Sequence, residues 1–191
     1  MRPAVVIPIK SFTVAKGRLA DTLTPDQRAA LAQQCAETVV RAAHDLPVFV
    51  VCSDATVARW AMHLGAHVVD CQTPGLDVAV TAGRDAAIAS GATHIIVAHA
   101  DLPLATSLSH VVREGRISMV PDRHRDGTNV LAFPASVSFT TAYGPGSFDN
   151  HVRIAESLNV AVDVIEDEAL SLDLDTADDL GELARRQKGA S

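Results

Sequence analysis

The segment Thr93–Pro103 constrains the fold more than any other part of this 191-residue chain. It reads T-H-I-I-V-A-H-A-D-L-P, an apolar run that follows Gly91 and ends at an acid and a proline. Such a run is typical of a strand buried on both faces of a parallel sheet. Ligands of open α/β sheets bind outside the carboxyl ends of strands, so Asp101 is expected beside a cation or a network of donors. The alternative, that Asp101 only caps the segment Leu104–Arg113, stays open.

Apolar runs and helical stretches alternate along the chain. Strands are expected at Ala4–Ile9, Val48–Cys52, His67–Asp70, Ile95–Ala98, Ile117–Pro121, Val130–Phe133, Val160–Ile165 and Leu172–Leu174. Helices are expected from the Thr24 cap to about Ala43, from Ser53-Asp54 to Gly65, and at Leu76–Ser90, Ser107–Arg113, Phe148–Leu158 and Thr176–Gln187, with a loop at Lys10–Leu23. This order predicts βαβ units in a single α/β domain, residues 1–191. Helices become fewer after Asp101, which predicts a mixed sheet whose later strands extend one edge and shape a second pocket.

The composition indicates which binding partners and which cellular compartment to expect. A net charge of −7 argues against non-specific binding to nucleic acid or membranes, and 4% aromatic residues leave few rings to stack on bases. Three scattered cysteines fit neither a disulfide framework nor a zinc site, which favours a reducing, cytoplasmic location. Val5–Ile9 is the apolar run near the start, and it is too short for a signal peptide or a membrane span.

A basic loop follows the first expected strand. Lys10, Lys16 and Arg18 place three cations within nine residues, and Gly17 allows close backbone approach. Nucleotide-binding sheets hold polyphosphates at such a place, although this loop is neither a Walker loop nor G-x-G-x-x-G. On this interpretation, Lys16→Ala lowers turnover with folding stability almost unchanged; a merely solvated loop is the alternative.

A second acidic cluster lies near the carboxyl end of the chain. In L-D-L-D-T, Asp173 and Asp175 alternate along an expected strand and would present two carboxylates on one face. Together with Asp101 they predict a Mg²⁺ site, because Mg²⁺ prefers oxygen ligands completed by waters and phosphate oxygens. Helix capping by Asp175 or Thr176 would explain one of these residues but not both acids.

Two glycine-containing polar loops, Asp122–Val130 and Tyr143–His151, offer backbone donors for a phosphate or carboxylate. The candidate acceptor-binding residues are Thr128, Asn129, Gly144 and Ser147. Taken singly, each loop is also compatible with an ordinary turn. The histidines are expected to be structural or at the surface, with His151 undecided, and no serine stands in the G-x-S-x-G setting of a serine hydrolase.

Taken together, these motifs resemble a known family over Val5–Leu180. The shared features are a strand followed by P-x-K and A-K-x-R-L, then G-L-D, A-D-L-P, D-G-T-N, Y-G-P-G-S-F and L-D-L-D-T-x-x-D-L. The chain is similar to the CofC/FbiD guanylyltransferases of coenzyme F420 biosynthesis, within the group of MobA-like nucleotidyltransferases. One departure is Asp77, where these relatives usually carry asparagine.

The resemblance implies a Rossmann-like nucleotidyltransferase fold of the GT-A or MobA type, a three-layer sandwich around a mostly parallel mixed sheet. It implies GTP as co-substrate, Mg²⁺ as cofactor and a phosphorylated three-carbon acid as acceptor: phosphoenolpyruvate, 2-phospho-L-lactate or 3-phospho-D-glycerate. By motif, Lys10, Lys16, Arg18 and Asp101 would be catalytic. The nucleotide would bind Lys10, Lys16, Arg18, Gly75, Leu76 and Asp77, the metal Asp101, Asp173 and Asp175, and the acceptor Thr128, Asn129, Gly144 and Ser147. Transfer to a different acceptor, a non-catalytic GTP-binding module and a homodimer remain open.

Overall fold

The computed structural model describes residues 1–189, which form seven strands and five α-helices with two short 3₁₀ turns. The strands are β1 (Pro3–Pro8), β2 (Val48–Cys52), β3 (His67–Asp70), β4 (His94–Ala98), β5 (Ile117–Pro121), β6 (Thr128–Pro134) and β7 (Val162–Val164). The helices are α1 (Pro25–Ala42), α2 (Ala55–His63), α3 (Leu76–Ala89), α4 (Ser147–Ser157) and α5 (Ala177–Gly189). The 3₁₀ turns are η1 (Gly17–Leu19) and η2 (Ser109–Val111). No helix in the described range is both long and apolar enough to cross a membrane.

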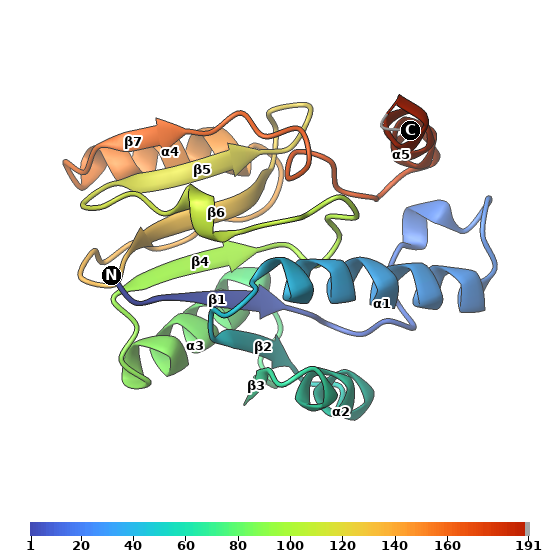
Figure 1. The fold of residues 1–191 in the computed structure, drawn as a ribbon, viewed down its shortest axis with the longest axis horizontal. Coiled ribbons are helices and arrows are strands. Elements are labelled where there is room, and N and C mark those ends of the chain that lie inside the picture. Colours follow the sequence, from blue (N-terminus) through green and yellow to red (C-terminus); the bar gives the residue numbers. More distant parts are fainter. Residues whose placement is uncertain (190–191) are drawn as a thin grey trace.

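All seven strands form one sheet in the order β3-β2-β1-β4-β6-β5-β7 (Figure 1). β6 pairs antiparallel with both β4 and β5, whereas every other pair is parallel. The expected mixed and mostly parallel sheet is therefore confirmed. β4, the strand expected from the Thr93–Pro103 segment, lies at its centre and is buried along its whole length.

Helices cover both faces of the sheet and make three layers. One apolar cluster joins α1 and α2 to the sheet through Ala36, Val39 and Val57, and the other joins α3 and α4 through Val80 and Phe148. Figure 1 shows α5 beyond the end of the sheet, away from both layers. Neither apolar cluster includes a residue of α5 among those described.

Local sequence signals explain where several helices begin. Thr24 and Gln27 form the expected reciprocal capping box at α1, and Asp54 accepts hydrogen bonds from the amides of Thr56 and Val57 at α2. On α3, a Cβ added to Gly83 would lie 2.4 Å from Val6 Cγ1. Glycine at this position therefore lets α3 pack directly against β1.

Two expected elements differ in the described structure. Leu172–Leu174 pairs with no strand; it is an extended segment whose two leucines are fully buried between half-exposed acids. The expected helix at Ser107–Arg113 shortens to the single turn η2. The alternating sequence therefore predicted the directions of the side chains at 172–175 correctly, but a strand was the wrong interpretation, because the neighbouring backbone makes isolated hydrogen bonds here and not a ladder.

Candidate active site

The candidate site lies at one edge of the sheet, where the parallel strands end and β6 begins. Because β6 is reversed, its first residues lie beside the carboxyl end of β4, and His99 N donates to Asn129 O at 3.0 Å. The segment that follows β7 returns to the same edge, where Leu174 N donates to Asp101 O at 3.1 Å. The topology thus brings together residues about 70 positions apart in the chain.

Lys16 is the centre of this arrangement. Its Nζ lies 2.9 Å from Asp101 Oδ2 and 3.4 Å from Asp175 Oδ1, and its side chain is only 5% exposed. The backbone of Lys16 is left-handed, with φ of 58°, which turns the chain into η1. Burial alone would lower the pKa of this ammonium, but the two carboxylates outweigh burial and raise the pKa. A solvated loop is thus the wrong interpretation for Lys16.

The pKa values of Asp101 and Asp173 shift in opposite directions, because one carboxylate is paired with Lys16 and the other is not. Burial would raise the pKa of Asp101, yet the Lys16 ammonium holds that pKa below its ordinary value. Asp173 lacks such a partner: burial and the nearby Asp101 charge raise its pKa to about 6. From side chains, its Oδ1 accepts a long hydrogen bond, 3.4 Å, from Asn129 Nδ2. Negative charge is therefore in excess on this side of Lys16.

These acids fit a hard divalent cation. Asp101 Oδ1 is buried and has no hydrogen-bond partner. Buried carboxylate oxygens are normally hydrogen bonded or bound to a cation, so this oxygen fits a metal ligand. Among residues 1–189, no three acidic, histidine or cysteine side chains are grouped tightly enough to hold a metal ion as they stand, and the Lys16 ammonium lies between two of the acids. The structure brings Asp101, Asp173 and Asp175 to one place; that they bind Mg²⁺ stays a prediction.

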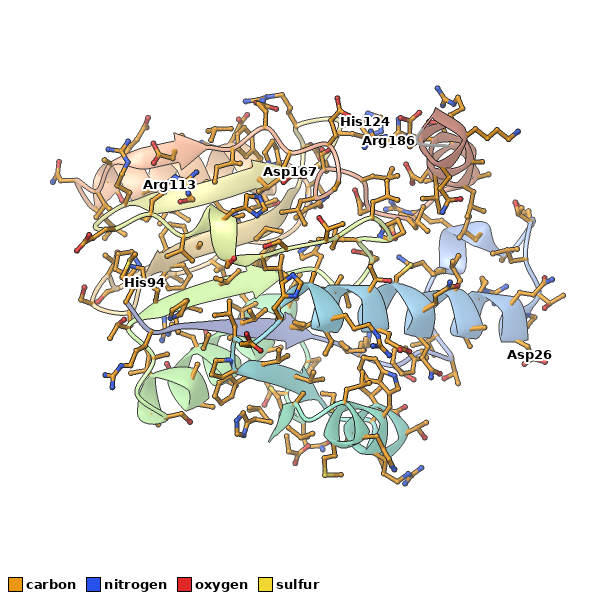
Figure 2. All side chains as sticks on the ribbon, viewed as in Figure 1. Asp26, His94, Arg113, His124, Asp167 and Arg186 are labelled. Atoms are coloured by element: carbon orange, nitrogen blue, oxygen red, sulfur yellow. The ribbon has the colours of Figure 1, made fainter. Side chains whose placement is uncertain are left out.

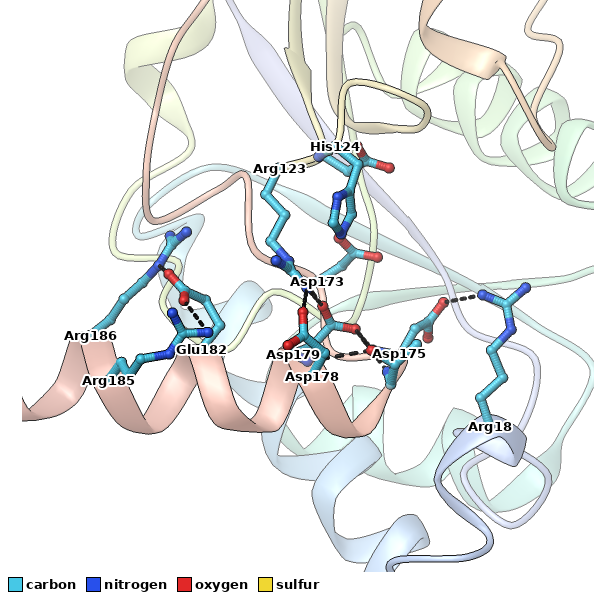
Figure 3. A network of polar contacts seen from close by, with 12 residues as sticks. Arg18, Arg123, His124, Asp173, Asp175, Asp178, Asp179, Glu182, Arg185 and Arg186 are labelled. Atoms are coloured by element: carbon cyan, nitrogen blue, oxygen red, sulfur yellow. Dashed lines mark hydrogen bonds and ion pairs between the residues drawn. The ribbon is translucent and has the colours of Figure 1, made fainter.

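The other two cations of the basic loop are exposed. Arg18 has a side chain 77% exposed, and its Nη1 lies 3.9 Å from Asp175 Oδ2 (Figure 3). Lys10 is exposed beside a cleft at the carboxyl ends of β1 and β2. The three cations therefore spread over a path from this cleft to the acids rather than meeting at one point.

The cleft has a volume of about 350 Å³ and lies between the strand ends and the start of α3. Gly75 and Leu76 line it, as do Cys52 and Ser53. Gly75 has φ of 128°, a conformation that L-residues rarely adopt, and no side chain caps the helix that follows it. The first amides of α3 are consequently left for another partner.

Asp77 does not line that cleft. Its Oδ1 instead accepts a hydrogen bond from Tyr143 N at 3.0 Å, which ties the first turn of α3 to the loop before α4. Asp77, where relatives usually carry asparagine, thus accepts a hydrogen bond from within the protein. The side-chain oxygen of an asparagine could accept the same bond.

Three of the candidate acceptor residues are buried. Thr128, Asn129 and Ser147 are 0%, 2% and 2% exposed, whereas Gly144 is exposed. Thr128 N already donates to Ser147 Oγ at 3.2 Å, so the Ser147 hydroxyl proton is free to donate elsewhere. Asn129 Nδ2 donates to Leu170 O and toward Asp173, and it therefore holds the acidic segment. The structure brings Thr128, Ser147 and Gly144 together and turns Asn129 toward the metal side.

His151 is a structural residue of this group. Ala142 N donates to its Nε2 at 2.9 Å, so its Nδ1 must carry the proton and donate to Thr128 Oγ1, also at 2.9 Å. Burial lowers its pKa to about 4, which keeps the ring neutral. The undecided histidine thus proves to be a buried connector between α4 and β6.

Sequence reasoning missed the residues that hold the loops. Asp122 accepts hydrogen bonds from the amides of His124, Asp126 and Gly127, and Asp179 accepts from Asp175 N and Thr176 N. Two signals could have revealed them: an aspartate followed by polar residues and glycine is typical of a turn held by its own side chain, and T-x-x-D is a variant of the capping box.

Comparison with known proteins agrees with the fold and the motifs. Residues 3–190 match the family model described as guanylyl transferase CofC like. A phosphoenolpyruvate guanylyltransferase from Sphaerobacter thermophilus is 33% identical over 96% of this chain and 93% of its own length. A 2-phospho-L-lactate guanylyltransferase from Methanothermobacter thermautotrophicus is 29% identical over 99% and 87%.

Solved structures share the architecture at low identity. A nucleotidyl transferase from Methanothermobacter thermautotrophicus superimposes with a TM-score of 0.67 at 13% identity, covering 100% of this chain and 99% of the other. At this identity the likeness supports the fold alone. It agrees with the expected nucleotidyltransferase type of sheet.

Proposed function

The chain belongs to the CofC-like guanylyl transferases and is therefore a nucleotidyltransferase that transfers GMP from GTP, and we propose that Mg²⁺ assists transfer to phosphoenolpyruvate or 2-phospho-L-lactate. The expected family and enzyme class are thereby confirmed. The finer proposal is carried by two observations: Lys16 pairs with both Asp101 and Asp175, and Asp173 lies close enough to these two acids for their charges to raise its pKa. The product would be a guanosine diphosphate conjugate of the acid, together with pyrophosphate.

The chemistry needs no general base. The acceptor phosphate has a second pKa near 6, so it is already a dianion at neutral pH. One of its oxygens attacks the α-phosphorus of GTP; that P–O bond forms while the bond from the α-phosphorus to the β-phosphate oxygen breaks, and pyrophosphate leaves. His151, the histidine beside the acceptor residues, agrees with this scheme because both of its ring nitrogens are already hydrogen bonded.

The protein contributes positioning and electrostatic stabilisation. A Mg²⁺ ion bound by Asp101, Asp173 and Asp175 would supply positive charge to the triphosphate and to the leaving pyrophosphate. The Lys16 ammonium lies among the same acids and would donate to a phosphate oxygen there. Lys10 and the first amides of α3 would hold the nucleotide in the 350 Å³ cleft.

The acceptor is assigned to the region around Thr128, Gly144 and Ser147. Its affinity must come from directed donors, because a small acid with two charged groups offers little apolar surface. The Ser147 hydroxyl and the exposed backbone at Gly144 are available there. Phosphoenolpyruvate and 2-phospho-L-lactate carry phosphate and carboxylate on one carbon, which suits so compact a group. The conjugate would then serve coenzyme F420 biosynthesis, the pathway implied by the resemblance to the CofC/FbiD family.

The experiment that tests this proposal is incubation of the purified chain with GTP, Mg²⁺ and one acid at a time, with mass detection of the conjugate. We expect conjugates of phosphoenolpyruvate or 2-phospho-L-lactate in preference to one of 3-phospho-D-glycerate. A clear preference for 3-phospho-D-glycerate overturns the choice of acceptor. GTP binding without any conjugate would favour the non-catalytic alternative. Turnover that a chelator leaves unchanged would contradict the proposed role of Mg²⁺.

A further inference from the structure

The helix α5 is unusual in what it buries. Of its residues Ala177–Gly189, the one that is buried is Asp179, a charged residue that is 6% exposed. Helices of globular proteins normally bury an apolar stripe, yet α5 stands clear of both layers of the sheet (Figure 1). Arg186 reaches back from α5 toward the body of the chain, where its guanidinium donates to Glu168 O (Figure 2). Polar contacts, and Asp179 above all, must therefore explain how this helix is placed.

Asp179 holds the segment that carries the candidate metal ligands. Its Oδ2 accepts hydrogen bonds from Asp175 N at 3.1 Å, Thr176 N at 2.8 Å and Thr176 Oγ1 at 2.8 Å. The extended segment before it has no strand partner, so these bonds take the place of a ladder. An amide fixed at Asp175 restricts the backbone from which the Asp175 carboxylate projects toward Lys16.

Arg123 completes this support from the loop between β5 and β6. Its Nε and Nη2 lie 3.0 and 2.8 Å from Asp179 Oδ1, and its Nη2 also contacts Asp178 (Figure 3). Its main-chain N donates to Ser171 O at 2.8 Å, at the start of the same segment. Burial would raise the pKa of Asp179, but hydrogen bonds from Thr176 and Arg123 lower it.

From these contacts we propose that Arg123 and Asp179 are positioning residues: the pair fixes the Asp173–Asp175 segment so that its carboxylates face the reaction centre. The guanidinium also neutralises Asp178 and Asp179, which lie next to the metal acids in sequence. A cation is thereby directed to Asp101, Asp173 and Asp175 rather than to the helix start. This inference rests on the proposed metal site and adds residues that do not touch metal or substrate.

The test measures metal affinity and steady-state kinetics of the full chain in parallel. Mn²⁺ serves as the probe and is followed by electron paramagnetic resonance with and without GTP. We expect Arg123→Ala to weaken Mn²⁺ binding and lower kcat by about 10–100-fold, as is usual when a group that supports metal ligands is removed. The KM for GTP should change by less than about twofold, because the cleft beside α3 is untouched.

Arg125→Ala is the matched control on the same loop. Arg125 pairs with the exposed Glu166 and lies over the ring of Phe148, away from Asp179, so its loss should leave Mn²⁺ affinity within about twofold. Low concentrations of guanidinium ion should restore part of the kcat of Arg123→Ala, which a general loss of folding would not allow. Asp179→Asn should show the same split between kcat and KM, which keeps the proposal testable should Arg123→Ala fail to fold.

Asp173→Asn separates the two levels of the proposal. Loss of Mn²⁺ binding in Asp173→Asn with unchanged binding and kcat in folded Arg123→Ala would overturn the positioning role and leave the metal site standing. Unchanged Mn²⁺ binding in Asp173→Asn would overturn the metal site, and the positioning role with it.

Discussion

The two sides of the sheet build their parts of the site by different means. On the β3-β2-β1-β4 side, main-chain ladders and helix starts place the cleft, Lys10 and Asp101. On the β6-β5-β7 side, side chains bind main-chain amides: Asp122 holds its own loop, Asp179 the acidic segment and Ser147 the start of β6. A ladder distributes its hydrogen bonds over many residues, whereas on the second side a few side chains, Asp122, Asp179 and Ser147, accept the bonds that hold whole segments. Single substitutions should therefore be tolerated less well on the second side.

The largest effect is expected for Asp173→Asn, on the β6-β5-β7 side. Turnover should fall about a hundredfold or more, the usual scale for removing an electrostatic contact to a reacting centre. Thermal stability at pH 7 should not fall, since burial and the Asp101 charge already disfavour the Asp173 carboxylate and raise its pKa. The exposed Asp178→Asn is the control for charge alone. Retention of most of the wild-type kcat would contradict this assignment.

Lys16→Ala tests the opposite side. A lost charge-assisted contact to phosphate is worth about 1.5–3 kcal/mol, so turnover should fall about tenfold or more. The unfolding free energy should also fall, by about 1–3 kcal/mol, because Asp101 is left without its partner. This corrects the sequence-based expectation that stability would hardly change. Arg18→Ala, at an exposed position, should leave stability as it is; equal destabilisation of both variants would contradict the buried ion pair.

The pH dependence of stability should report His151. Its pKa is about 4 in the folded chain and about 6.5 when unfolded, so the unfolded state binds more protons between those values. Stability from this group is complete above pH 6.5 and declines toward pH 4, by about 1–3 kcal/mol. Denaturant unfolding of wild type and His151→Gln across pH 4–7 should show a difference curve with this slope. Parallel curves would mean that folding does not lower the pKa of His151.

Ser147→Ala should raise the acceptor KM by about 3–10-fold and leave the GTP KM nearly unchanged, because only one of the two substrate regions is touched. Some stability should be lost as well, because the buried Thr128 amide loses its acceptor. Ser157→Ala, at the exposed end of the same helix, is the matched control. Equal increases in both KM values would make Ser147 a purely structural residue.

The smallest effect is expected for Asp77→Asn, at the bridge between the two sides. An asparagine oxygen can still accept from Tyr143 N, so kcat and both KM values should change by less than about twofold. Asp77→Ala removes the acceptor and should have the larger effect on the acceptor KM. If Asn proved as damaging as Ala, the negative charge rather than the hydrogen bond would matter.

The sequence predicted the sheet and the position of Asp101 because both depend on local patterns. β-branched runs indicate buried strands, and a carboxylate after such a run lies at the edge where ligands bind. The capping signals at Thr24 and Asp54 were equally local and marked their helix starts. The sequence also predicted a cation or donors beside Asp101, but no local pattern identified Lys16 as that cation.

Other features depend on tertiary contacts that no window of sequence contains. The reversal of β6 is fixed by pairing with β4 and β5, so the position of Asn129 beside Asp173 could not be read from its own neighbours. The pairing of Arg123 with Asp179 joins residues 56 positions apart. Leu172–Leu174 alternates like a strand because it is packed on one side, although it has no neighbouring strand to pair with.

The single reversed strand has a consequence for how an enzyme of this kind can diversify. The donor nucleotide is assigned to parallel strand ends whose geometry also holds the core, so that side resists change. The proposed function assigns the acceptor to the turn of the antiparallel β5–β6 hairpin and to the loop before α4, both outside the parallel ladder. Replacement of these two short segments could exchange one phosphorylated acid for another while the guanylyl donor and its chemistry are inherited intact.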